Sequence, residues 1–150
     1  MMETTFRPVA RADIELLLPF MREYYEFDHL SFDERVARTA LENFIDDPTF
    51  GRVWWLSVDN ELVGYLILTL GYSIEYGGRD AFIDEVYIRE SHRGHGIGRQ
   101  AIAFAEAQCR ALDVYALHLE VERDNTAAHA LYRQVGFVDH DRYLMTKRVS

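Results

Sequence analysis

Cysteine and long apolar runs are scarce in this chain of 150 residues, and each shortage excludes a class of protein. The one cysteine, Cys109, excludes an intramolecular disulfide and a multi-cysteine metal site. The longest mostly apolar stretch, residues 62–72, is interrupted by Gly64 and Thr69 and is far shorter than the roughly 20 residues that a bilayer span needs. The first residues contain no basic segment followed by an apolar core, so we expect no secretory signal and a cytoplasmic location.

Positive charge is also in short supply, because 16 lysines and arginines face 25 acidic residues and the net charge is −9. Such a surface repels nucleic acid and anionic lipid and favours cationic partners, so we expect neither a nucleic acid nor a membrane as partner. The basic residues gather locally, with only Glu90 opposing Arg89, His92, Arg93, His95 and Arg99. This island predicts an anionic ligand, and a solvated loop is an equal alternative from charge alone.

The length predicts a single domain over residues 1–150, without repeats or low-complexity segments. Hydrophobic periodicity and turn residues predict strands at 4–8, 52–58, 61–72, 81–88, 114–121, 137–138 and 143–149, and helices at 13–26, 33–45, 97–112 and 125–135. The order βααβββαβαββ predicts an α/β fold with a mixed, largely antiparallel sheet flanked by helices and one β-α-β crossover.

A glycine-rich segment, His92-Arg93-Gly94-His95-Gly96-Ile97-Gly98-Arg99, joins the strand at 81–88 to the helix at 97–112. The N-terminus of a helix carries unpaired N–H groups and about half a positive charge, so it binds phosphate. Glycines allow positive φ and close approach of the backbone to a ligand, and the arginines could add charge-assisted hydrogen bonds. The segment therefore predicts a pyrophosphate site, and a glycine-rich turn without a ligand is the alternative.

The spacing of the glycines separates the kinds of phosphate loop. A Walker loop needs Lys-Ser or Lys-Thr after the last glycine, where this chain has Arg99-Gln100. A dinucleotide fingerprint needs G-x-G-x-x-G, whereas the spacing here is G-x-G-x-G, although Glu120 and Glu122 stand about where a ribose-binding acid would follow. The loop lies past mid-chain and leaves a single crossover behind it, too little for a doubly wound sheet. A nucleotide-binding domain stays as the weaker alternative.

Residues 93–98 match the loop Q/R-x-x-G-x-G/A, and the chain here resembles the GCN5-related N-acetyltransferases, the GNAT superfamily. Residues 82–88 are similar to the central strand of that family. The pattern N-x-x-A-x-x-L-Y at 125–132, followed by Gly136-Phe137, is similar to its later helix and strand. The resemblance covers residues 82–138 well and the N-terminal helices only in kind. It implies a sheet that splays between the fourth and fifth strands.

The resemblance also implies how acetyl-CoA, the co-substrate, is held. Its pantetheine arm would enter the splay and pair with the backbone of Val86, Tyr87 and Ile88, and the N–H of Val86 would meet the oxyanion. Its pyrophosphate would lie on the loop formed by Arg93, Gly94, His95, Gly96, Ile97, Gly98 and Arg99. The helix that follows would contribute Asn125, Ala128 and Tyr132.

Acyl transfer to an amine needs a base, since an alkylammonium titrates near ~10.4, and an acid for the leaving thiolate. Tyr132 is the candidate acid that the resemblance implies, and it shares a helix face with Asn125; a packed aromatic is the alternative from spacing alone. Asp84 and Glu85 are the candidate bases, and strict alternation along a strand would turn only one of them toward the cleft. Cys109 lies on an apolar helix stripe, so we expect direct attack in a ternary complex rather than a covalent enzyme intermediate.

Aromatic and acidic residues near the end of the first helix predict the acceptor site, which this region borders in the family. Together with a residue before the central strand, they are Tyr24, Tyr25, Asp28 and Tyr76. Cation–π contacts and charge pairing suit a small cationic amine or a peptide amine, and an exposed helix end is the alternative. His92 and His95 have a metal-like spacing without a third ligand nearby, so we expect no metal.

The resemblance leaves two functions open. The first is an acetyl-CoA-dependent N-acetyltransferase that acts on a primary amine. The second is a catalytically silent regulatory domain of the same fold that binds an acyl-CoA. Family analogy also allows a homodimer.

Overall fold

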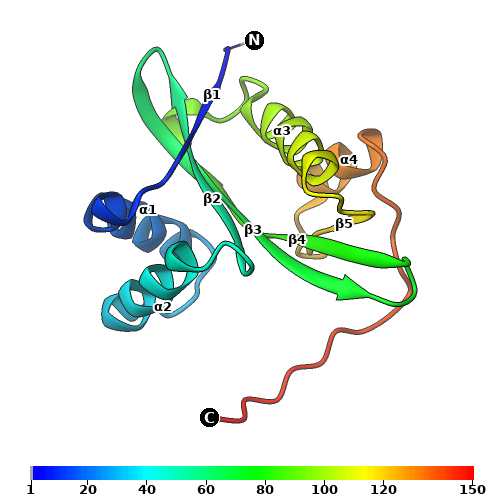
Figure 1. Cartoon of the computed structure of the whole chain (residues 1–150). Helices are drawn as coiled ribbons and strands as arrows, with labels where there is room; N and C mark the ends of the chain where they lie inside the picture. The colour runs from blue at the N-terminus through cyan, green and yellow to red at the C-terminus, as the bar shows by residue number, and fades with distance from the viewer. Residues whose placement is uncertain (1) are drawn as a thin grey trace. The chain divides into compact units, whose positions relative to one another are not determined.

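A five-stranded sheet with the order β1-β2-β3-β4-β5 is the framework of the computed structural model, which describes residues 2–150 (Figure 1). The chain divides into two compact units, Met1–Glu120 and Val121–Ser150, and the sheet lies in the first. The elements of that unit are β1 (Thr5–Pro8), η1 (Arg11–Asp13), α1 (Ile14–Phe27), α2 (Glu34–Asp46), β2 (Gly51–Val58), β3 (Glu61–Ser73), β4 (Gly78–Ile88), η2 (Glu90–His92), α3 (Ile97–Ala111) and β5 (Ala116–His118). The predicted α/β class is confirmed, since the pairs β1–β2, β2–β3 and β3–β4 are antiparallel and β4–β5 is parallel.

Local chemistry explains where the early elements begin and end. The side chain of Asp33 accepts hydrogen bonds from the N–H groups of Arg35 and Val36 at 3.0 and 3.2 Å, which caps the start of α2. Asp59 and Asn60, which join β2 to β3, have φ values of 51° and 65°. Short acidic and amide side chains tolerate this left-handed conformation, so the predicted two-residue hairpin turn forms.

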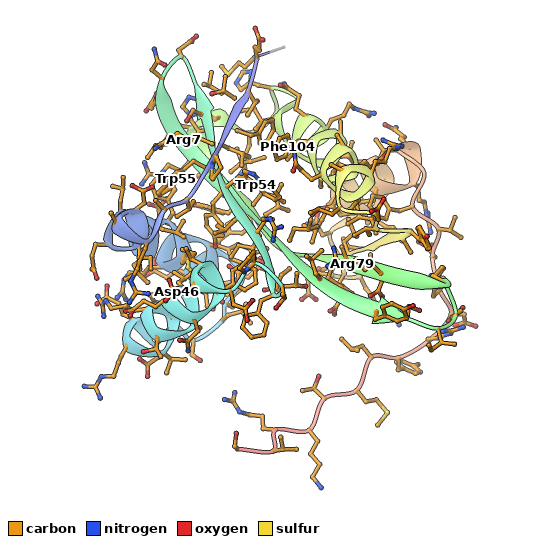
Figure 2. All side chains as sticks on the ribbon, in the orientation of Figure 1. Arg7, Asp46, Trp54, Trp55, Arg79 and Phe104 are labelled. Atoms are coloured by element: carbon orange, nitrogen blue, oxygen red, sulfur yellow. The ribbon has the colours of Figure 1, made fainter. Side chains whose placement is uncertain are left out.

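Two consecutive tryptophans show how the sheet divides the core into two layers. Trp54 and Trp55 are neighbours on β2 and therefore point to opposite faces (Figure 2). Trp54 meets the ring of Phe104 on α3 edge-on with centroids 5.0 Å apart, whereas Trp55 meets Phe20 on α1 at 5.3 Å. Helices α1 and α2 thus cover one face of the sheet, and α3 covers the other (Figure 1).

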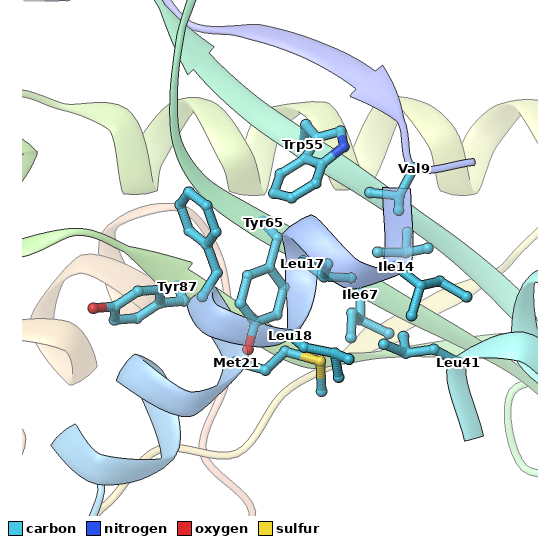
Figure 3. Close-up of a cluster of buried hydrophobic side chains, with 12 residues drawn as sticks. Val9, Ile14, Leu17, Leu18, Met21, Leu41, Trp55, Tyr65, Ile67 and Tyr87 are labelled. Atoms are coloured by element: carbon cyan, nitrogen blue, oxygen red, sulfur yellow. The ribbon is translucent and has the colours of Figure 1, made fainter. Parts of the chain in front are cut away.

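The larger cluster of buried side chains lies between the sheet and helices α1 and α2 (Figure 3). Its members come from both helices, from three strands and from the residue that follows β1: Val9, Ile14, Leu17, Leu18, Phe20, Met21, Leu41, Val53, Trp55, Tyr65, Ile67 and Tyr87. Most are fully apolar, but Tyr65 and Tyr87 bring hydroxyl groups that need partners when buried. This layer therefore carries polar atoms into the middle of the sheet, where the candidate site lies.

The parallel pairing between β4 and β5 is short. It joins Asp80 to Ala116, Ala81 to Leu117 and Phe82 to His118. Strand β4 continues to Ile88, but within residues 2–150 no strand pairs with it on that side beyond Phe82. The predicted splay between the fourth and fifth strands therefore begins directly after Phe82, and the predicted strand at 114–121 is reduced to Ala116–His118.

The second unit contains one helix, α4 (Thr126–Gln134), and the structure assigns no strand to its residues. The predicted strands at 137–138 and 143–149 were wrong. Tyr143, Leu144, Met145 and Val149 are all exposed. A strand satisfies its backbone groups through a neighbouring strand, and apolar residues in the sequence alone do not supply that neighbour. The prediction of a single domain is not tested by this division.

Candidate active site

The glycine-rich loop takes the conformation that its sequence predicts. It follows η2 and ends where α3 begins at Ile97, with Gly96 as the residue that precedes the helix. Gly94 and Gly96 have φ values of 80° and 82°, a region that costs other residues about 1–2 kcal/mol. Because glycine has no capping side chain, no side chain caps the first N–H groups of α3 at this position. This end of α3 fits an anionic ligand that approaches the backbone closely.

Arg93 holds the loop to the end of β4. Its Nε donates a hydrogen bond to the carbonyl oxygen of Ile88 at 2.9 Å. Its guanidinium lies 4.3 Å from the ring centre of Phe27 and 5.7 Å from that of Tyr87. Part of the Arg93 side chain thus serves the protein itself rather than a ligand, whereas Arg99, on the first turn of α3, is exposed.

Two tyrosine hydroxyls hold the carboxylate of Glu85. Tyr25 donates to its Oε2 and Tyr65 to its Oε1, each at 2.7 Å. Burial raises the pKa of Glu85 above its ordinary value. The hydrogen bonds from the two tyrosine hydroxyls stabilise the charged form and partly oppose this shift. A half-buried carboxylate with a raised pKa that is fixed by two donors has the properties of a general base.

The neighbouring Asp84 departs from the predicted alternation because β4 contains a bulge there. Leu68 of β3 pairs with Ile83, and Ile67 pairs with Glu85, so Asp84 has no partner in this register. Ile83 and Glu85 therefore lie on opposite faces although they are two residues apart. Burial raises the pKa of Tyr25, and the charges of Glu85 and Asp84 raise it further. The strict alternation on which the prediction for Asp84 and Glu85 depended is therefore broken at Asp84.

A second polar group lies at the point where β4 and β5 separate. His118 pairs with Phe82 in the last register position, and its Nε2 lies 3.1 Å from Oδ2 of Asp80. The ring of His118 also contacts Phe82 at 4.9 Å and Tyr76 at 5.2 Å. Gly71 leaves room for this arrangement, since a Cβ atom there would lie 2.8 Å from Oδ1 of Asp80. The group fixes the strands just before they part.

The predicted acceptor residues fall into two places. Tyr24 and Tyr25 of α1 contact each other with ring centres 5.6 Å apart. Burial raises the pKa of the Tyr24 hydroxyl, and the nearby carboxylate of Asp28 raises it further. Tyr76 lies instead beside His118. The structure therefore brings Tyr24, Tyr25 and Asp28 together near Glu85 and assigns Tyr76 to the other end of β4.

Three residues of the site carried no clear signal in the sequence. Tyr65 stands in an apolar strand and reads as core, although a buried tyrosine on a central strand requires a hydroxyl partner. His118 stands alone in its strand, and nothing in the sequence pairs it with Asp80. Glu23 of α1 binds Arg89 at 2.8 Å and accepts from the hydroxyl of Tyr87 at 3.1 Å, which lowers its pKa.

An open pocket lies beside this ion pair, between the second half of α1 and the end of β4. Its volume is about 540 Å³, and its lining consists of Glu23, Glu26, Phe27, Tyr87, Arg89, Glu90 and Ser91. The lining combines aromatic rings with three carboxylates and one arginine. It suits a polar ligand that carries positive charge.

The second unit presents the predicted Asn125 and Tyr132 on α4. The side chain of Asn125 accepts from the N–H of Ala128 at 3.2 Å, so Asn125 caps this helix. Tyr132 meets Phe137 edge-on at 5.9 Å, and burial raises the pKa of its hydroxyl. A raised pKa keeps the hydroxyl protonated at neutral pH, as a proton donor requires.

The described residues form neither a membrane-spanning helix nor a group of potential metal ligands. No helix among residues 2–150 combines the length and the apolar character needed to cross a membrane. Over the same residues, no three histidine, cysteine or acidic side chains gather as they would around a metal ion.

Strand β4 separates from β5 after Phe82 and leads through the glycine loop to the N-terminus of α3, the arrangement expected of a GNAT fold. The family described as "Acetyltransferase (GNAT) family" matches residues 16–137. An integron cassette protein from the mobile metagenome of Cole Harbour Salt Marsh has a similar crystal structure, with a TM-score of 0.85, 30% identity and coverage of 97% of this chain and 90% of that one. The chain belongs to the acetyltransferase (GNAT) family.

Two similar curated proteins are named as N-acetyltransferases. The "Uncharacterized N-acetyltransferase YycN" of Bacillus subtilis is 31% identical over 98 residues, which are 65% of this chain and 61% of YycN. A "Thialysine N-epsilon-acetyltransferase" of Bos taurus is 27% identical over 142 residues, 89% of this chain and 83% of that protein. The chain thus spans less than two thirds of the length of YycN.

Proposed function

We propose that this protein is an acetyl-CoA-dependent N-acetyltransferase that acetylates a primary amine by direct attack in a ternary complex. The observation that carries the proposal is the unpaired edge of β4, which leads from the glycine loop to Glu85. Family membership supports the reaction class, and the conformation of Gly94 and Gly96 supports a diphosphate ligand. The family's match across residues 16–137 supports the whole chain acting as one catalytic domain.

The residues present fit coenzyme A. The N–H groups of the first turn of α3 and the loop before it would hold the diphosphate, with Arg99 adding charge. The backbone of Val86, Tyr87 and Ile88 would pair with the amide groups of the pantetheine arm, because no strand of the described chain occupies that edge. Acetyl-CoA supplies an activated thioester, and a free thiol is the group released.

Glu85 is the base in this proposal. An alkylammonium must lose its proton before it can attack, and Glu85 is fixed by Tyr25 and Tyr65 while its pKa is raised toward neutral pH. Asp84 supports it by adding negative charge nearby, which attracts a cationic acceptor and further raises the pKa of Glu85. The neighbouring Tyr24 and Asp28 would border the acceptor.

Tyr132 is the proposed acid for the departing thiolate, and Asn125 orients the start of its helix. Support for this role comes from the motif, and the Tyr132 hydroxyl is protonated at neutral pH. Cys109 is buried and burial raises the pKa of its thiol, which favours direct transfer over a covalent enzyme intermediate.

The acceptor is proposed to be a small cationic amine or the amine of a peptide. The aromatic rings and carboxylates around Glu85, together with the acidic pocket beside Glu23, support a cationic substrate. The bovine relative's name specifies thialysine, so thialysine and lysine belong in the first panel of substrates.

The test is a thiol-release assay with acetyl-CoA and a panel of diamines, amino acids, aminoglycosides and peptides. We expect release above the rate of hydrolysis with at least one amine. A matched control is Glu15→Gln, which changes an exposed ion pair with Arg38 on α1 and should leave the rate unchanged. Tight CoA binding without turnover on any amine would instead favour a silent acyl-CoA-binding domain.

A further inference from the structure

The N-terminal segment, residues 2–6, contacts the glycine loop and the first turn of α3. The N–H of Met2 donates to the carbonyl oxygen of His95, inside the loop, at 3.3 Å. The side-chain oxygen of Gln100 accepts from the N–H of Thr4 at 2.9 Å, and its nitrogen donates to the carbonyl oxygen of Met2. The side-chain oxygen and nitrogen of Gln100 thus both bind the N-terminal segment, at Thr4 and Met2, which are 96 and 98 residues away in sequence.

A ring contact fixes the same segment one helical turn later. Phe6 stacks on Phe104 of α3 with ring centres 4.1 Å apart and planes inclined by 4°. Phe6 also pairs with Leu56 in the sheet, so its backbone is held independently of α3. The segment is therefore anchored in the sheet at Phe6 and reaches the glycine loop at Met2.

These contacts add restraint to a loop that contains two glycines with positive φ. Gly94 and Gly96 have the greatest backbone freedom of any residue type, and fixing them costs conformational entropy on ligand binding. A Cβ atom at Gly94 would meet nothing within 4 Å, so packing does not restrain that residue. Restraint comes from Arg93 at one end of the loop and from Met2 and Gln100 at the other.

We infer that Gln100 is a positioning residue for the diphosphate site: by tying residues 2–4 to α3, it holds the loop at His95 and Gly96 in the shape that receives the ligand. Its own amide does not contact the ligand, because Met2 and Thr4 occupy it. A loop ordered in advance loses less entropy when the diphosphate binds, so affinity rises without a new contact. The inference rests on the proposed function, since it takes CoA as the ligand.

The test compares donors with and without a diphosphate in the variant Gln100→Leu. The leucine keeps the approximate size of the side chain and removes both hydrogen bonds. We expect the Kd for CoA and the KM for acetyl-CoA to rise roughly tenfold, the scale of one or two net hydrogen bonds, while kcat stays unchanged. For S-acetyl-pantetheine, which lacks the diphosphate, kcat/KM should equal that of the wild type. Gln108→Leu, on the same helix away from the loop, is the matched control and should change neither donor.

Hydrogen exchange provides a second readout. The amides of residues 94–99 should exchange faster in Gln100→Leu, and those of the β2–β3 pair should not. If Gln100→Leu does not fold, Phe104→Leu removes the stacking contact instead and should raise the Kd for CoA in the same direction.

The outcomes separate the two claims. An unchanged Kd for CoA in a folded Gln100→Leu protein would overturn the positioning role and leave the proposed function standing. An equal loss with both donors would also overturn it, because it would indicate general damage. Failure of the wild-type protein to bind CoA would overturn the proposed function and this inference together.

Discussion

Replacing Glu85 by glutamine perturbs the proposed base and little else. Glutamine has nearly the same shape, and its amide can still meet the hydroxyls of Tyr25 and Tyr65, which bind the two carboxylate oxygens at 2.7 Å. It cannot accept a proton from an ammonium group. We therefore expect kcat to fall by about 10²–10⁴-fold, the usual contribution of a positioned general base, while the KM for acetyl-CoA changes little.

The Glu85→Gln substitution should lower activity without lowering thermal stability. Burial raises the pKa of Glu85 above its ordinary value of 4.5. The stability that this group contributes is therefore fully present below pH 4.5 and is lost as the pH rises through the raised pKa. Each tenfold difference in proton affinity corresponds to about 1.4 kcal/mol and to about 3–6 °C in Tm for a chain of this size. The glutamine variant has no such group, so at pH 7 its Tm should equal or exceed that of the wild type.

The assay combines steady-state thiol release between pH 5 and 9 with thermal melts over the same range. Asp84→Asn is the matched control, because it removes the adjacent carboxylate, which has no hydrogen bond to either tyrosine, and its effect on kcat should be smaller. Wild-type turnover in a folded Glu85→Gln protein would refute the assignment of Glu85 as the base. A sharp fall in Tm at pH 7 would refute the assignment of a raised pKa.

Three further predictions concern the loop and the second unit. Tyr132→Phe should lower kcat by roughly 10- to 1000-fold with an unchanged melting curve, and full activity would remove Tyr132 from the mechanism. Gly96→Glu should abolish CoA binding measured by calorimetry, because a carboxylate would face the diphosphate and the φ of 82° disfavours any side chain; unchanged affinity would contradict the loop assignment. The carboxyl of Asp139 should titrate with a pKa of about 2 by NMR, because hydrogen bonds from Arg133 and His129 lower its pKa. The shift should disappear in the double variant Arg133→Ala, His129→Ala. A normal pKa in the wild type would exclude these contacts in solution.

Sequence reasoning located the elements with strong local signals. The turn at Asp59-Asn60, the start of the helix at Asp33 and the glycines at 94 and 96 have conformations that depend on residues close by in the sequence, so their places could be predicted. The strand at 81–88 was found because β-branched and aromatic residues cluster there.

Features that depend on distant partners could not be read in this way. The bulge at Asp84 arises from the register with Ile67 and Leu68, which no local pattern encodes. The contact of His118 with Asp80 and the hydrogen bonds of Gln100 to Met2 and Thr4 join segments far apart in the chain. The residues at 143–149 begin with apolar side chains that favour a strand, but local composition does not supply a partner strand.

Calorimetric titration with CoA, with NAD and ATP as comparison ligands, tests the central claim most directly. If the backbone from Arg93 to Arg99 receives a CoA diphosphate, the folded protein should bind CoA with measurable heat and should bind it more tightly than either nucleotide. Stronger binding of NAD or ATP, or the absence of any CoA binding to folded protein, would contradict the account.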